Sequence, residues 1–316
     1  MIPILERADW RALLPGQVSE IRAVDVETGA VRVVARSSTL VLEAPNWTPD
    51  GRWIVVNAGG LLYRIPASGG EPEAIDTGWL TDNNNDHLVS RDGTTIYSSS
   101  ETTGHLYAIP LGGGEPRRVS GERPGPFGYF LQGESPDGRL LAYTGGERRD
   151  GRGFASGLFL LDLAAERDPS ADRRIGAWPE DSVGCEFDPT GRWLYFSSEK
   201  DAEIRGHAQI HRMRADGSEL ERLTDDERVN WFPKLAPDGS RLVYLSFPPG
   251  TVGHEANVPV IIRSMDLDGG GCRDVVAFVG GQGTLNVNGW SPDSRWFACA
   301  AYPIDTADPL EGELDR

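Results

Sequence analysis

Short apolar runs, each introduced by a tight polar turn, recur along the chain. Six stretches share this pattern: NWTPDGRWIVV (46–56), LVSRDGTTIYS (88–98), GESPDGRLLAY (133–143), EFDPTGRWLYF (186–196), KLAPDGSRLVY (234–244) and GWSPDSRWFAC (289–299). In a Pro-Asp-Gly turn, proline fixes φ, aspartate bonds to nearby backbone, and glycine takes a positive φ without steric penalty. The run that follows is rich in β-branched and aromatic residues. This pattern predicts the first two strands of a repeated unit.

The spacing of the turns indicates the fold. Aligned on the turn glycine, the intervals between repeats are 42, 45, 53, 48 and 55 residues. A period of about 40–50 residues with several strands per repeat is typical of a β-propeller. We therefore expect an all-β, six-bladed propeller of four-stranded antiparallel blades. The turn glycines that we expect at positive φ are Gly51, Gly93, Gly138 and Gly239.

The two ends of the chain predict how the ring closes. The sixth repeat ends at RWFACAAYP (295–303), after only two strands, whereas residues 21–35 form a hairpin pattern with no turn motif before it. Pairing the N-terminal strands with the last blade would complete that blade and leave no open sheet edge. We expect an N-terminal extension at 1–18, one propeller domain at 19–302 and an acidic tail at 303–316.

The repeats resemble those of a known family. SPDGRLLAYTG (135–145), and APDGSRLVYLS (236–246) after DGSELERLT (216–224), are similar to the WD40-like (PD40) repeats of TolB-type six-bladed propellers. The resemblance covers roughly residues 19–302. It extends to the cytoplasmic subgroup without TolB's N-terminal domain, through segments 83–93, 230–239, 252–257 and 280–294. It is specific for fold and nearly silent on function, because this fold serves many functions.

The composition of the chain limits the classes of partner that the protein is expected to bind. The net charge of −17 disfavours binding to nucleic acid or to an anionic membrane surface. No apolar stretch approaches the roughly 18 residues of a membrane span. Glu6 and Arg7 interrupt the first apolar stretch before it reaches signal-peptide length, and the three cysteines share no CxxC spacing. We expect a cytoplasmic protein.

One mouth of the expected channel carries the candidate site. The loops joining second to third strands are long at 144–157, 197–209 and 247–259, and loops on a rigid scaffold carry function. Polar and aromatic residues gather there and where the chain enters the first strands. The candidate ligand-binding residues are Asn84, Asn85, Tyr129, Gln132, Asn230, Trp231, His254, Asn286 and Asn288, with Asp86 and His87 as candidate catalytic residues. Amides, a carboxylate and imidazoles suit a sugar-like ligand, but asparagine is also an ordinary turn residue, and channel amides also bind water.

Three functions fit these residues. The first is binding of a polar small molecule or a protein partner at the long-loop mouth. The second is a carbohydrate lyase or hydrolase acting on acidic or oxidised sugars, with His87 as base and Asp86 as its orienting residue. The third is a protein-interaction scaffold. The Arg-rich residues 147–152 could cover the pocket and attract a carboxylate.

A metal cofactor is the remaining question. The resemblance extends to oligogalacturonide lyases, which imply a manganese-type ion held by channel histidines. This chain has Lys234 and Gln132 where similar proteins tend to carry histidine. His87 and His254 are the residues suited to a divalent ion if one binds. We expect a pocket without a tightly held metal.

Overall fold

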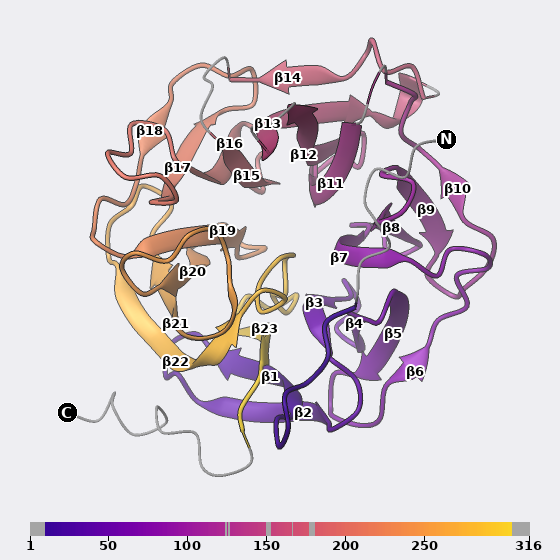
Figure 1. Cartoon of the computed structure of the whole chain (residues 1–316), viewed down its shortest axis with the longest axis vertical. Helices are drawn as coiled ribbons and strands as arrows, with labels where there is room; N and C mark the ends of the chain where they lie inside the picture. The colour runs from indigo at the N-terminus through magenta and orange to yellow at the C-terminus, as the bar shows by residue number, and fades with distance from the viewer. Residues whose placement is uncertain are drawn as a thin grey trace.

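The protein is a ring of six β-sheets (Figure 1). The computed structural model describes residues 10–123, 125, 127–149, 153–165, 167–176 and 181–304, with backbone alone at 147–149 and 153–155. Five sheets have four strands and the sixth has three. The prediction of an all-β, six-bladed propeller is confirmed.

Each blade is an antiparallel meander running outward from the ring's axis. Blade one contains β3 (Glu43–Trp47), β4 (Trp53–Ala58), β5 (Leu61–Pro66) and β6 (Glu73–Ala74). Blade two contains β7 (Asn83–Val89), β8 (Thr95–Ser100), β9 (Leu106–Pro110) and β10 (Arg117–Arg118). Blade three contains β11 (Phe127–Glu134), β12 (Leu140–Arg149), β13 (Gly153–Asp162) and β14 (Arg173–Ile175), with a 3₁₀ turn at Leu163–Ala165.

The other half of the ring repeats this arrangement. Blade four contains β15 (Ser182–Phe187), β16 (Trp193–Ser198), β17 (Gln209–Arg214) and β18 (Glu221–Arg222). Blade five contains β19 (Val229–Leu235), β20 (Leu242–Phe247), β21 (Ala256–Met265) and β22 (Arg273–Gly281). Blade six combines β23 (Trp296–Ala301) with β1 (Ser19–Asp25) and β2 (Val31–Ser37).

The turn glycines adopt the predicted conformation. Their φ angles are 73° at Gly51, 70° at Gly93, 71° at Gly138 and 70° at Gly239. Ser294, which replaces glycine in the sixth repeat, has a φ of 59°. The repeated turn therefore keeps one backbone geometry even where the residue changes.

The ring closes through the N-terminal hairpin, as predicted. β1 lies between β2 and β23, and Ala23 pairs with Ala298 in an antiparallel register. Because both edges of β1 are paired and both faces are covered, every residue of the strand is buried. At the inner position of this blade the structure has only an isolated bridge between Trp290 and Phe297 rather than a full strand.

Apolar side chains between neighbouring blades hold the ring together. Ile21, Ile54 and Tyr302 belong to one buried cluster that joins blade six to blade one. Within the described part of the chain, no helix has the length and apolar character needed to cross a membrane. Residues 1–9 and 305–316, which include half of the expected extension and most of the expected tail, lie outside the described residues.

Candidate functional site: a cavity at the long-loop mouth

A cavity of about 430 Å³ lies at the mouth where second strands connect to third strands. We call it the long-loop cavity. Inner strands β7, β11 and β19 supply part of its wall, and the connections after β8 and β20 supply another part. Residues 10 and 11, which precede the propeller, lie against it as well.

Three carboxylates line the long-loop cavity, and burial is the main cause of their shifted pKa values. Asp86 lies on β7, Glu101 directly follows β8, and Glu43 begins β3. Burial raises the pKa of Asp86 to about 7, while a hydrogen bond from Gln132 opposes the shift. Burial likewise raises the pKa of Glu43 to about 7, against the attraction of Arg11, and raises the pKa of Glu101. Asp86 and Glu43 therefore exchange protons near neutral pH, unlike ordinary surface carboxylates.

Arg11 ties the N-terminal segment to this mouth. Its Nη1 donates to Glu43 Oε1 at 3.1 Å and to the Gln282 carbonyl oxygen at 2.7 Å, and its Nη2 donates to Asn257 Oδ1 at 2.9 Å. The guanidinium also lies 3.8 Å from the ring centroid of Tyr302. These contacts occupy both terminal nitrogens and fix Arg11 beside Glu43, while its buried Nε has no hydrogen-bond partner among the described residues.

Aromatic rings form another part of the wall. Trp10, Phe130 and Phe232 line the long-loop cavity. Phe232 has a φ of 56° and lies at a register shift in β19, so the local bulge aims its ring differently from those of its strand neighbours. His254 also lines the cavity and packs on Phe232, with ring centroids 5.2 Å apart; burial lowers the pKa of His254.

Four residues that line the cavity carry a buried polar atom without a hydrogen-bond partner among the described residues: Arg11, Gln132, Thr144 and Gln282. Two of these side chains are almost completely buried. Gln132 and Thr144 line the cavity and are each 4% exposed. Gln132 Nε2 donates to Asp86 Oδ1 at 3.1 Å, but Gln132 Oε1 and Thr144 Oγ1 have no hydrogen-bond partner among the described residues. Because burying an unpaired polar group costs free energy, such atoms indicate a place where water or a ligand completes the bonding.

The structure brings together about half of the residues predicted for the site. Those that line the long-loop cavity are Asn84, Asn85, Asp86, Gln132, His254 and Asn286. The sequence places the amides of 83–86 in a loop leading into the first strand, but the structure includes them in β7. The predicted cover at 147–152 lies outside the residues whose side chains are described.

His87 does not line the long-loop cavity, although its neighbour Asp86 does. The His87 side chain is fully buried, and neither ring nitrogen has a hydrogen-bond partner among the described residues within standard geometry. Burial lowers its pKa to about 4, so the ring is neutral at physiological pH. The arrangement gives His87 no path to a ligand in this cavity as base or metal ligand.

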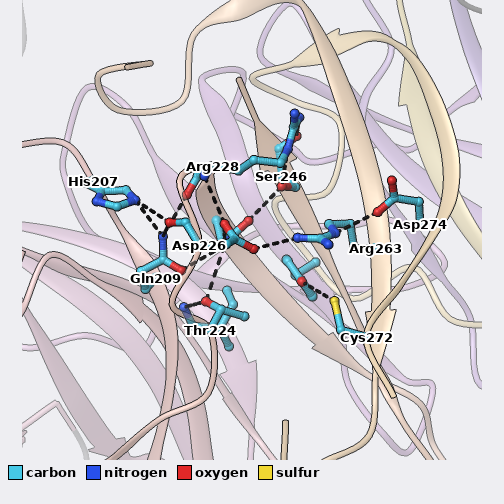
Figure 2. A network of polar contacts seen from close by, with 12 residues as sticks. His207, Gln209, Thr224, Asp226, Arg228, Ser246, Arg263, Cys272 and Asp274 are labelled. Carbon is cyan, nitrogen blue, oxygen red and sulfur yellow. Dashed lines mark hydrogen bonds and ion pairs between the residues drawn. The ribbon is translucent and has the colours of Figure 1, made fainter. Parts of the chain in front are cut away.

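Asn230 belongs to a structural network rather than to the long-loop cavity. It is fully buried; its Nδ2 donates to Gln209 Oε1 at 3.0 Å and to Asp226 Oδ1 at 3.1 Å, and its Oδ1 accepts from Ser246. Figure 2 shows the surrounding network, in which Asp226 also accepts from Arg263 Nη1 at 2.7 Å. Asn230 therefore joins blades four and five, and its bonding capacity is used internally.

Three further predicted residues lie away from the long-loop cavity. Tyr129 is 1% exposed and its hydroxyl donates to the Gly121 carbonyl oxygen at 3.2 Å. Trp231 is 4% exposed and packs edge-on against His254 from behind the cavity wall. Asn288 lines a second cavity, at the mouth formed by the Pro-Asp-Gly turns, where its Nδ2 donates to Glu186 and to the Leu235 carbonyl oxygen.

The second cavity, which we call the turn-mouth cavity, measures about 240 Å³. Pro49, Pro237 and Trp290 contribute to its wall, and Gln132 lines both cavities. Lys234 is fully buried on β19, and its Nζ lies 3.8 Å from Glu186 Oε2. Burial lowers the pKa of Lys234, and the attraction of Glu186 opposes that shift.

Several residues of the long-loop cavity carry no clear signal in the sequence. Arg11 lies in the expected extension, Glu43 and Glu101 are isolated acidic residues, and Gln282 lies in a glycine-rich segment. Glu43 alone had a usable signal, because it lies eight residues before the turn glycine Gly51, at the position that Asn85 and Asn286 occupy in the second and sixth repeats. Among the described residues, no group of three or more His, Cys, Asp or Glu side chains is arranged to hold a metal ion.

Comparisons with known proteins identify the family. No family model matches the chain. An uncharacterized protein of Agrobacterium fabrum is 35% identical over 293 residues, covering 91% of this chain and 94% of that protein. A solved structure from Agrobacterium tumefaciens, assigned provisionally as TolB, has a TM-score of 0.81 at 34% identity, covering 91% of this chain and 99% of the other. The chain belongs to the TolB-like family of six-bladed β-propellers.

More distant structures share the fold of this TolB-like propeller. TolB from Acinetobacter baumannii has a TM-score of 0.59 at 15% identity, with 93% of this chain and 68% of that chain covered. An oligogalacturonate lyase in complex with manganese has a TM-score of 0.55 at 15% identity, with 85% and 74% covered. At this identity the likeness concerns architecture alone.

Proposed function

We propose that this TolB-like propeller binds a polar small molecule, sugar-like in size, in the long-loop cavity. The observation that carries the proposal is the pair of unpartnered polar atoms, Gln132 Oε1 and Thr144 Oγ1, on side chains that are almost completely buried beside the cavity. A volume of about 430 Å³ falls within the range of small-molecule sites. Amide, carboxylate and aromatic groups around it match the mixed surface of a polyhydroxylated compound.

The competing functions gain no comparable support. The lyase or hydrolase hypothesis needs His87 at the reacting centre, and that ring is buried away from the long-loop cavity. The lyase neighbour shares only the fold with this chain. A scaffold function would require a continuous apolar surface, whereas the large exposed residues Trp79 and Ile204 come from blades that are not neighbours in the ring.

A thermal-shift screen with neutral, cationic and anionic sugars and polyols tests this function. A ligand at 100 times its Kd stabilises the folded protein by ~2.7 kcal/mol, so a genuine ligand raises the Tm measurably. Thr144→Val should weaken the shift, because it removes a hydroxyl that the ligand would bond, and should leave the unliganded Tm close to that of the wild type. Thr102→Val, at an exposed side chain outside the cavity wall, is the matched control. The proposal fails if no compound in the screen raises the Tm.

We also propose that the protein acts in the cytoplasm. Cys185, Cys272 and Cys299 are all free thiols, as is usual in a reducing compartment. Cell fractionation followed by immunodetection tests the location. Recovery of the protein in a periplasmic or secreted fraction would refute it.

A further inference from the structure

The long-loop cavity has more acceptors and negative charge to offer than donors and positive charge. Gln132 points its amide nitrogen at Asp86, which leaves the amide oxygen as the unpartnered atom. Asp86 and Glu101 both line the cavity, and their mutual repulsion contributes to the raised pKa of Asp86. A ligand that satisfies these groups must therefore donate hydrogen bonds and carry positive charge.

Two cations lie in or near the cavity, Arg11 and Lys234, and each keeps one buried nitrogen (Arg11 Nε and Lys234 Nζ) without a hydrogen-bond partner among the described residues. The terminal nitrogens of Arg11 bond to Glu43, Gln282 and Asn257. Lys234 is fully buried behind the wall, with Glu186 as its closest ion-pair partner. Among the described residues that line the cavity, three carboxylates (Glu43, Asp86 and Glu101) face one arginine, Arg11, and Arg11 pairs with Glu43 rather than with Asp86 or Glu101.

Aromatic rings surround the same space. Trp10, Phe130 and Phe232 line the cavity together with the carboxylates. The negative face of an aromatic ring attracts an ammonium group, and carboxylates beside such rings strengthen that attraction. An anionic sugar would meet repulsion from Asp86 and Glu101, and the charge of Arg11 at this cavity is paired with Glu43.

We propose that the ligand of the long-loop cavity is an amine-bearing polyol, whose ammonium group lies between Asp86, Glu101 and the aromatic wall while its hydroxyls bond to Gln132 and Thr144. This inference rests on the proposed function and specifies its ligand class. Binding requires Asp86 in its ionised form, so the ligand displaces a proton where that carboxyl is partly protonated. The other charged or titratable groups facing this space are Glu43, Glu101, Arg11 and His254, and Lys234 attracts the Asp86 carboxylate from behind the wall.

A matched set of three six-carbon compounds tests the inference. Glucamine, sorbitol and gluconate differ at one end of the chain, which carries an ammonium, a hydroxyl or a carboxylate. Isothermal titration calorimetry of the full chain should show glucamine binding about tenfold more tightly than sorbitol, with gluconate the weakest. The affinity for glucamine should rise between about pH 6 and pH 8, because this aliphatic amine stays protonated while Asp86 ionises. Titrations in buffers of different ionisation enthalpy should detect the released proton.

Substitutions of the carboxylates test whether their charge, rather than the shape of the cavity, causes the preference for glucamine. Glu101→Gln should remove most of the preference for glucamine over sorbitol while sorbitol binding persists. Glu115→Gln, at an exposed carboxylate on the outer turn of the same blade, should leave the preference unchanged. Asp86→Asn is the second variant if Glu101→Gln does not fold, and it should also abolish proton release.

The outcomes distinguish this inference from the function on which it rests. Equal affinity for all three compounds, or tighter binding of gluconate, would overturn the ammonium assignment and leave a polar-ligand site in place. A preference for glucamine that survives both variants would also overturn it, because groups other than Asp86 and Glu101 would then recognise the ammonium. Failure of every compound in both the screen and the calorimetry would remove the proposed function itself.

Discussion

The turn aspartates at one mouth of the ring and the buried carboxylates at the other have pKa values that are shifted in opposite directions. On the turn mouth, Asp50, Asp92 and Asp137 each accept a hydrogen bond from a Ser or Thr hydroxyl two residues earlier, at 2.6, 2.6 and 2.5 Å. These bonds hold the pKa of each carboxyl below its usual value. At the long-loop mouth, burial raises the pKa of Asp86 and Glu43 to about 7.

The opposite pKa shifts follow from where each carboxylate finds its hydrogen-bond partners. A turn aspartate bonds to its own turn, so its role is fixed by local geometry and repeats from blade to blade. Asp86 and Glu43 depend on partners from other blades and from the N-terminal segment. Carboxylates that bond to their own turn, such as Asp50, have their hydrogen-bonding capacity used locally, whereas the bonding of Asp86 and Glu43 depends on the closed ring.

The largest effect that we expect comes from a glycine at each mouth. Gly51 and Gly283 both have positive φ, but a Cβ at Gly51 would lie 3.7 Å from its nearest neighbour, Pro292. A Cβ at Gly283 would lie 2.5 Å from Glu43 Oε1 and 2.6 Å from the Tyr302 hydroxyl. Gly51→Ala should therefore cost ~1 kcal/mol from backbone strain alone, and Gly283→Ala ~3 kcal/mol because Glu43 must also move.

Urea denaturation of the two glycine variants measures this difference directly. Equal losses of stability would show that Glu43 and Tyr302 relax freely, and the long-loop mouth would then be less rigid than its contacts indicate. A larger loss for Gly51→Ala would reverse the comparison.

A smaller effect separates the carboxylates by their pH dependence. Asp86 has a folded-state pKa near 7, above its unfolded value, so the folded state holds the proton more tightly and wild type loses stability as pH rises from about 4 to 7. Asp86→Asn avoids this loss and should gain on the order of 2 kcal/mol relative to wild type across that window. Asp137 has a lowered pKa, so Asp137→Asn should instead be less stable than wild type above about pH 4.

Unfolding free energies at several pH values test both aspartate variants. At neutral pH, the free energy of unfolding should be higher than that of wild type for Asp86→Asn and lower for Asp137→Asn. If Asp86→Asn were destabilising by the same amount at pH 4 and pH 7, the Asp86 carboxyl would be titrating normally and open to solvent.

The smallest effect concerns His87, which lies beside Asp86 in sequence but is excluded from the long-loop cavity. Its pKa of about 4 lies below the unfolded value, so the unfolded state gains a proton first and the folded protein loses stability as pH falls from about 6.5 to 4. His87→Leu should remove this part of the acid sensitivity, on the order of 1 kcal/mol. An NMR titration should show a ring that stays neutral at pH 6. A normal histidine titration would place the ring in contact with solvent and return it to the candidate site.

The sequence by itself determined the blades. Turn geometry depends on residues within four positions of one another, and the strands are set by short apolar runs, so the period, the turn conformation and the closure by residues 21–35 could all be inferred. The sequence also identified which mouth carries the long loops. It also predicted Asp86, Gln132, His254 and Asn286, which line the long-loop cavity, because they lie on a long loop or where the chain enters a first strand.

Only the tertiary structure decided which polar residues face the long-loop cavity. Asp86 and His87 are adjacent in the chain, and a register shift in β7 between Asn83 and His87 accompanies the change in how they are placed. In the sequence, Asn230 is equivalent to the other amides, but in the structure its amide nitrogen donates to Gln209 and Asp226 and is not available to a ligand. Arg11 reaches Gln282 across 271 residues, a contact that exists only once the ring has closed. Local residue preferences fix a repeat, whereas burial and pairing between blades decide which of its polar groups remain available to a ligand.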